Sequence, residues 1–174
     1  MVEEEKLDMR SGAAVPDLKP SRRRLRRYGP LIVWAVLIFI GSGNLLSASN
    51  TGSFLIRPMR WLFPQVSNTT LGVVQFFLRK AAHFTEYGIL ALLAARAFRS
   101  SKREWLRARW FFASLAVVVI YSLSDEFHQS FVPTRTASIF DSLIDSLGGL
   151  CALTVLWWLA WKRDAQPGGS KWTP

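Results

Sequence analysis

The chain has 174 residues, half of them apolar, and a formal net charge of +10 at pH 7. This length allows one compact domain. The apolar residues come in long blocks between short charged segments, whereas a soluble domain would space them at periods of two or 3.6, so we interpret the chain as an integral membrane protein. The basic residues end these blocks, a pattern typical of cytoplasmic loops and of contact with anionic lipid. Without a nucleic-acid-binding motif, this pattern excludes nucleic acid as the expected partner.

The N-terminal segment runs from an acidic start to an arginine block, and we predict that residues 1–29 form a disordered, basic cytoplasmic tail. The first apolar block runs from Pro30 to about Ser47. As a helix it would be about 27 Å long, close to the thickness of the hydrocarbon layer. A basic run before an apolar run also resembles a signal peptide, but the leader would be unusually long, so we predict a first transmembrane helix.

Three further apolar blocks predict three more transmembrane helices. The segment from Asn50 to Thr70 is mixed, and its Trp and Arg residues predict a loop with a short amphipathic helix at the outer interface. The blocks that follow run from about Leu71 to Ala95, from Trp110 to Ser124 with acidic residues continuing the same helix, and from Ile139 to Trp161. We therefore predict an all-α bundle with four transmembrane helices over residues 30–162, followed by a disordered cytoplasmic tail over residues 163–174.

The distribution of basic residues predicts the orientation of these helices. Most of them lie in the N-terminal tail, in residues 96–109 and after the last apolar block. Few lie in the segments predicted on the other side of the membrane, namely Arg57, Arg60, Arg79, Lys80 and Arg135. Because positive loops stay in the cytoplasm, we predict a protein of the cell membrane with both termini cytoplasmic.

Polar residues gather at the predicted outer ends of the last three helices. Lys80, His83 and Tyr87 recur at spacings of three and four and share one helix face. On the next predicted helix, Asp125, His128 and Gln129 share a face, and on the last one Asp141 and Asp145 are one turn apart. The candidate catalytic residues are His83, Glu86, Asp125, Glu126 and His128, and the candidate substrate-binding residues are Lys80, Tyr87, Gln129, Arg135, Asp141 and Asp145.

Ionisable residues in membrane segments cost about 2.5 to 3.5 kcal/mol each on insertion scales, so several together call for a reason. Residues near helix ends can reach water, and this explanation suffices for any one of them alone. However, both histidines of the chain, His83 and His128, belong to this group, and His83 lies well inside an apolar block. The combination favours a functional site.

Three kinds of chemistry are open to such a site. His and carboxylate ligands from separate helices could hold a metal and activate water, although no HExxH spacing is present. Alternatively, His and a carboxylate could act as acid and base while Lys80 and Arg135 hold a phosphate or carboxylate group. The third alternative is a structural salt-bridge network that orders the helices. The residues do not decide among these, and they assign no metal, cofactor or oligomeric state.

The single cysteine, Cys151, excludes an intramolecular disulfide bond. It lies within an apolar block without an activating base one turn away, which favours a packing residue over a nucleophile.

Three motifs give the chain a family resemblance. They are Lys80-Ala-Ala-His83-Phe84-Thr-Glu86-Tyr87-Gly88, Ser124-Asp125-Glu126-Phe-His128-Gln129-Ser-Phe131-Val-Pro-Thr-Arg135 and Asp141-x3-Asp145-x2-Gly148. Together they resemble the VanZ-like family of bacterial membrane proteins, over roughly Ile32 to Trp161. Two positions depart from the family pattern, because Asp145 stands where Asn is expected and Thr134 stands where Gly commonly precedes the Arg.

The resemblance implies a small helical membrane protein of poorly defined biochemical activity. The family is named after a member associated with low-level resistance to the glycopeptide antibiotic teicoplanin. We therefore expect an outward-facing site that binds, and in one interpretation modifies, a lipid-linked or phosphate-bearing cell-envelope substrate, with membrane lipid and lipid-linked precursors as partners. The alternative is a non-catalytic membrane factor that assists or shields an envelope partner. A transporter ranks third, because four short helices leave little room for a translocation path.

Overall fold

The computed structural model describes residues 19–42, 57–132 and 138–165. Helices make up 88% of these residues, and no strand occurs among them, which confirms the all-α prediction. The helices are α1 (Lys19–Ser42), α3 (Asn68–Arg99), α4 (Glu104–Ala108), α5 (Trp110–Gln129) and α6 (Ile139–Asp164). Residues 57–62, within the segment predicted to contain a short amphipathic helix, are also helical.

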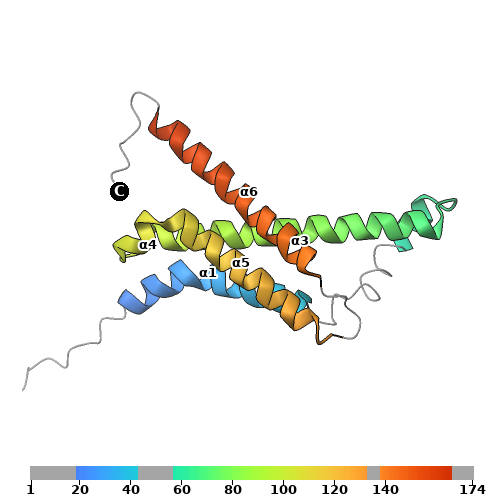
Figure 1. Ribbon diagram of the computed structural model, residues 1–174, viewed down its shortest axis with the longest axis horizontal. Coiled ribbons are helices and arrows are strands. Elements are labelled where there is room, and N and C mark those ends of the chain that lie inside the picture. The colour runs from blue at the N-terminus through green and yellow to red at the C-terminus, as the bar shows by residue number, and fades with distance from the viewer. Residues whose placement is uncertain (1–18, 43–56, 133–137, 166–174) are drawn as a thin grey trace, which may run out of the picture.

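The long helix α3 is the centre of the bundle and packs against α1, α5 and α6 (Figure 1). Helix α1 runs antiparallel to α3, because Trp34 Nε1 donates to the carbonyl of Glu86 at 2.9 Å while Arg96 Nη2 donates to the carbonyl of Arg26 at 2.8 Å. The bundle continues in the same up-and-down manner through α5 and α6. The end of α1 and the end of α5 therefore meet the start of α6 beside the middle of α3.

Three helices are long and apolar enough to cross a membrane, judged by length and composition: Arg22–Ser42, Trp110–Gln129 and Ile139–Arg163. The structure thus supports a multi-pass membrane protein. Helix α3 does not meet the same criterion, so the predicted number of four spans is not confirmed. Its apolar sequence is interrupted by Lys80, His83 and Glu86, and these polar residues lie on the helix that the other three surround.

The surface and the interior of the bundle show the distribution expected for a membrane protein. Large apolar side chains such as Ile120 and Trp157 are more than half exposed. In contrast, the interior holds small residues, among them Ala91 and Ala95, which let neighbouring helices approach closely. Lipid tails can cover such a surface, whereas water would make it unfavourable.

Helix α1 begins earlier than the sequence predicted. It starts at Lys19 rather than at Pro30, so residues 19–29, which the sequence assigns to the disordered tail, belong to the same helix as the first apolar block. Proline inside a helix removes the hydrogen bond to the carbonyl four residues before it, which here belongs to Arg26. That carbonyl accepts a hydrogen bond from Arg96 instead. A contact from α3 therefore compensates for the proline. At the other end of the chain, α6 continues through Asp164, beyond the predicted end of the domain at residue 162.

Helices α3 and α6 cross in very close contact. A Cβ atom at Gly148 would lie 2.2 Å from the backbone oxygen of Phe84, too close for any side chain. A Cβ at the neighbouring Gly149 would lie 2.7 Å from Val118 Cγ1 of α5. The two glycines thus hold α6 against both partners directly beside the residues predicted to form a site.

Candidate functional site

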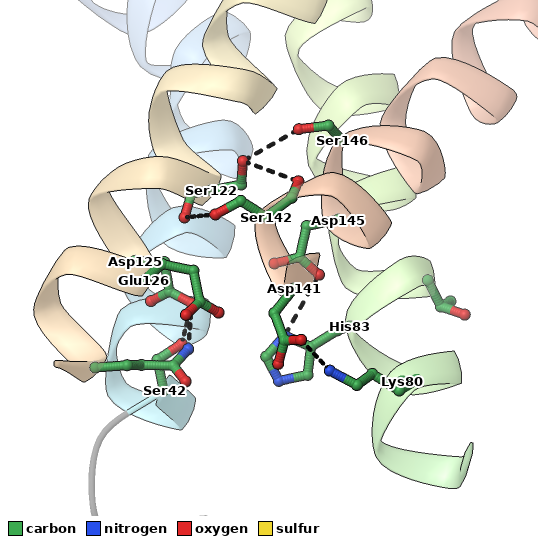
Figure 2. A network of polar contacts seen from close by, with 12 residues as sticks. Ser42, Lys80, His83, Ser122, Asp125, Glu126, Asp141, Ser142, Asp145 and Ser146 are labelled. Atoms are coloured by element: carbon green, nitrogen blue, oxygen red, sulfur yellow. Dashed lines mark hydrogen bonds and ion pairs between the residues drawn. The ribbon is translucent and has the colours of Figure 1, made fainter. Parts of the chain in front are cut away.

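Polar side chains from four helices meet at one end of the bundle, as Figure 2 shows for most of them. We call this group the polar cluster, and the corresponding end of the bundle the polar end. The cluster consists of Ser42 from α1, Lys80, His83 and Tyr87 from α3, Asp125, Glu126 and Gln129 from α5, and Asp141 and Asp145 from α6. Residues predicted from three separate segments thus come together.

Asp125 is the link between α1 and α5. Its Oδ2 atom accepts hydrogen bonds from Ser42 Oγ and from Gln129 Nε2, both at 2.8 Å. Its Oδ1 atom is buried without a hydrogen-bond partner, and the residue is only 3% exposed. Ser42 was not among the predicted residues, because a serine at the end of an apolar helix has no distinctive pattern.

Glu126 holds the first turn of α6. Its Oε2 atom accepts a hydrogen bond from the backbone N–H of Ser138, the N-cap residue of α6, at 2.7 Å. A carboxylate at a helix N-terminus is favourable because the unpaired N–H groups and the helix dipole both attract negative charge. Its Oε1 atom is buried and has no partner. Only half of the carboxylate is therefore used for structure.

Lys80 and Asp141 form an ion pair between α3 and α6. Their side chains are 14% and 20% exposed, so water screens this pair only in part. The Lys80 ammonium also lies 5.3 Å from the ring centre of Phe76. These contacts occupy the lysine that the sequence had assigned to substrate binding.

His83 and Asp145 form the more deeply buried of the two ion pairs of the cluster, with side chains 15% and 1% exposed. His83 Nδ1 lies 3.5 Å from Asp145 Oδ1, close enough for an ion pair when the imidazole is protonated. Asp145 is 1% exposed, and neither of its oxygens has a hydrogen-bond partner. The negative charges of Glu86 and Asp125 also act on His83. A histidine placed between carboxylates can take up and release a proton.

Tyr87 is completely buried next to these acids. Its hydroxyl interacts electrostatically with Asp125 and Asp145, but no partner meets the geometry of a hydrogen bond. The neighbouring Glu86 uses its backbone carbonyl to accept the Trp34 indole N–H. Tyr87 lies on the same face of α3 as His83, with Glu86 beside it. The hydrogen bond between Trp34 of α1 and Glu86 was not indicated by the spacing of these residues.

Three predicted site residues are not members of the cluster: Glu86, whose charge acts on His83, and also His128 and Arg135. The ring of His128 stacks on Phe39 of α1, with ring centres 4.3 Å apart, and the described contacts do not bring it against a carboxylate. It shares the last turn of α5 with Asp125, but it points toward α1. Arg135 lies outside the described residues.

Serine hydroxyls adjoin the cluster between α5 and α6. Ser122 Oγ lies 3.2 Å from Ser146 Oγ, while Ser142 Oγ donates to the carbonyl of Ser122 at 3.2 Å (Figure 2). These small polar residues let the two helices approach and hydrogen-bond in an apolar surrounding. The sequence analysis missed them, although their spacing of four on α6 was a detectable signal.

The cluster contains nearly all of the buried polar atoms that lack a partner in the described part of the chain. Six of the seven such side-chain atoms belong to it, and the seventh is in His128. The six are His83 Nδ1, Tyr87 Oη, Asp125 Oδ1, Glu126 Oε1 and both oxygens of Asp145. Two of the six, His83 Nδ1 and Asp145 Oδ1, face each other at 3.5 Å as an ion pair, which leaves four without a partner. Each unpaired buried group costs about 1 to 3 kcal/mol, more when charged, and water or a ligand would satisfy these four. No set of three His, Cys, Asp or Glu residues in the described ranges is arranged to hold a metal ion.

Comparison with known proteins identifies a family. The sequence model of the VanZ/LLP1 family matches residues 28–160, which include every residue of the polar cluster. No curated protein matches the chain, and neither does any solved structure.

Proposed function

Since the chain belongs to the VanZ/LLP1 family and is a multi-pass membrane protein, we propose that its polar cluster binds the polar group of a lipid-linked cell-envelope substrate. The observation that carries this proposal is the set of carboxylate and phenol atoms without a hydrogen-bond partner in one buried place, beside the pair of His83 and Asp145. Evolution of a purely structural network would be expected to pair these atoms, because a half-satisfied polar network is less stable than an apolar core. Hydroxyl or amine donors of a substrate head group would satisfy them.

His83 and Asp145 are the residues suited to chemistry on such a substrate. Their separation of 3.5 Å allows the carboxylate to orient the imidazole and to stabilise its protonated form. The imidazole would then accept a proton from a substrate hydroxyl or amine, or return it. Arg135, from the connection between α5 and α6, would supply the positive charge for a phosphate group, because Lys80 is already engaged by Asp141. A connection to glycopeptide susceptibility would follow from binding an envelope precursor.

This proposal includes the orientation of the protein. With four spans and both termini cytoplasmic, the polar end faces outward, where envelope precursors are used. Reporter fusions after Arg103 and after Trp172 should then read cytoplasmic, and a fusion at Thr134 should read external. A cytoplasmic reading at Thr134 would contradict the proposal, because the cluster would face the wrong compartment.

The central test changes Asp145 to Asn, which removes the charge and keeps the shape. Purified wild-type and variant proteins in lipid nanodiscs are incubated with a polyprenyl diphosphate-linked sugar, and the bound lipid is measured by native mass spectrometry. We expect at least a tenfold loss of bound lipid in Asp145→Asn, because the carboxylate that faces His83 loses its charge, and we expect a moderate loss of thermal stability, because the buried pair with His83 is broken. Glu104→Gln is the matched control, since Glu104 is 89% exposed at the other end of the bundle.

A second candidate function is a non-catalytic membrane factor in which the cluster only joins the helices. The contacts of Asp125 with Ser42 and Gln129, and of Lys80 with Asp141, favour it. In that case Asp145→Asn would leave lipid binding unchanged. The same measurement therefore separates the two candidates.

A further inference from the structure

Large apolar side chains surround the polar end on three helices. They precede Lys80 on α3, follow Asp125 on α5 and in the turn after its end, and precede Asp141 at the start of α6. Each is between 50% and 70% exposed. We call them the apolar collar, which consists of Phe76, Phe77, Phe127, Phe131, Ile139 and Phe140.

The collar continues the apolar surface of the membrane-spanning helices. On α5, the exposed residues Ile120 and Leu123 lead to Phe127 at spacings of three and four, so they lie on one helix face. On α6, Phe140 is followed three residues later by the exposed Leu143. On α5 and α6, the faces that are exposed and apolar in the middle of the helices therefore continue to the level of the cluster, whereas on α3 Arg79 follows Phe76 after three residues.

The lengths of α3 and α6 indicate how deep the cluster and the collar lie in the hydrocarbon layer. From Arg99 at the end of α3, the helix rises about 24 Å to His83, and Phe76 lies about 10 Å further. On α6, Asp145 is about 27 Å from Arg163. The hydrocarbon layer is about 30 Å thick, and any helix tilt shortens these distances along the membrane normal. If the basic residues mark one edge of the layer, His83 and Asp145 lie within it, and Phe76 and Phe140 lie at the opposite edge.

We infer that lipid acyl chains cover the apolar collar and that the polar cluster is consequently recessed beneath the membrane surface. Figure 1 shows that α3 extends well past the ends of α1 and α5 at this end, so its exposed phenylalanines reach beyond the cluster. A ligand of the recessed cluster reaches it from the lipid layer rather than directly from water. The inference concerns the surface of the protein and holds whichever ligand the cluster takes.

The test measures the depth of single positions in the bilayer. Cys151 is replaced by Ser, and single cysteines are introduced as Phe77→Cys, Phe127→Cys and Phe140→Cys. Each is spin-labelled in reconstituted full-length protein, and its collisions with oxygen, which enters lipid, are compared with those with a water-soluble nickel chelate. We expect oxygen to dominate at all three collar positions.

Two references calibrate the measurement. The native Cys151 is exposed in the middle of α6 and marks the depth of the bilayer centre. Arg103→Cys, on the exposed connection before α4, marks the aqueous phase. Collar labels that meet the nickel chelate as often as the Arg103→Cys label would overturn the inference. Low access to both reagents, with spin coupling between copies, would overturn it in favour of a second copy of the chain. If a Phe substitution prevents folding, Ile139→Cys tests the same surface with the same two outcomes.

Discussion

The two ends of the helix bundle carry charge in opposite ways. At the end with the C-terminus of α3 and the start of α5, Arg99 lies over the ring of Trp110 at 5.1 Å, and at the end of α6 Lys162 lies over Trp158 at 3.8 Å. These cations are exposed or half-buried beside aromatic rings, as expected for residues at a membrane interface. At the polar end, Asp125 and Asp145 are almost completely buried, and oxygens of both lack partners.

Burial without a hydrogen-bond partner, rather than charge, therefore distinguishes the carboxylates of the candidate site from the cations at the predicted membrane interface. An exposed charge in this protein keeps its hydration and costs little. A buried carboxylate without a donor costs several kcal/mol unless something neutralises or binds it. The cations of the basic end therefore need no ligand to explain them, whereas the buried carboxylates of the polar end are the groups that water or the proposed ligand would satisfy. The following changes test this difference, from the largest expected effect to the smallest.

The first change separates α3 from α6 at the polar end. Gly148→Ala would place a methyl group 2.2 Å from the backbone oxygen of Phe84, and a backbone atom cannot move aside as a side chain can. We expect destabilisation by about 3 kcal/mol and a strong loss of abundance. Thermal unfolding of purified protein and immunoblotting of membranes measure both.

Gly88→Ala is the matched control for this change. Its added methyl group would meet the oxygen of Gly148 at 3.5 Å, which is ordinary contact. This variant should unfold within a few degrees of the wild type. Equal loss in both variants would show that the close crossing is not what joins the helices.

The second change compares two ion pairs at opposite ends. Lys80→Met leaves Asp141 without its partner in a partly buried place, and we expect a loss of about 1 to 3 kcal/mol. Arg107→Met breaks the exposed 3.5 Å pair with Glu104 and should cost less than about 0.5 kcal/mol. Thermal unfolding at low and high salt measures the difference. Equal losses of stability in both variants would show that the ion pair at the polar end is screened by water as strongly as the exposed pair at the basic end.

The third change concerns Arg135, which lies outside the described residues. If its planar guanidinium clamps a substrate phosphate, Arg135→Lys should lose nearly as much bound lipid as Arg135→Ala, because both lose bidentate geometry. We expect a loss of about tenfold in each, at normal abundance, by native mass spectrometry. Rescue by Lys, with low abundance for Ala only, would instead indicate that the arginine balances the acidic residues of the cluster.

The last change, at the basic end, is expected to have a small effect on stability and none on lipid binding. Arg99→Gln removes the cation above Trp110 and should lower stability by about 0.5 to 1 kcal/mol without changing lipid binding. Thermal unfolding and the lipid-binding measurement check this. A loss of lipid binding here would contradict the assignment of the site to the polar end alone.

The sequence by itself determined the all-α class, the positions of the apolar helices and most members of the cluster. Helical periodicity places Lys80, His83 and Tyr87 on one face, and alternation of apolar blocks brings the ends of separate helices to the same side. The family resemblance rested on the same residues and is confirmed by the match over residues 28–160. The helix faces, the apolar blocks and the family motifs all depend on the spacing of residues along the chain, which can be read from the sequence.

Only the tertiary structure decided which side chains meet. Periodicity identifies a face but not the rotation and depth at which two helices pack, so it did not indicate the pairing of His83 with Asp145 or the hydrogen bond from Ser42 to Asp125. For the same reason it included His128, whose position on the helix turns it toward Phe39. The helical arginine segment of α1 was missed because Arg96, distant in sequence, supplies the hydrogen bond that Pro30 cannot make. Contacts between distant residues have no local signal, because they arise from the packing of complete helices.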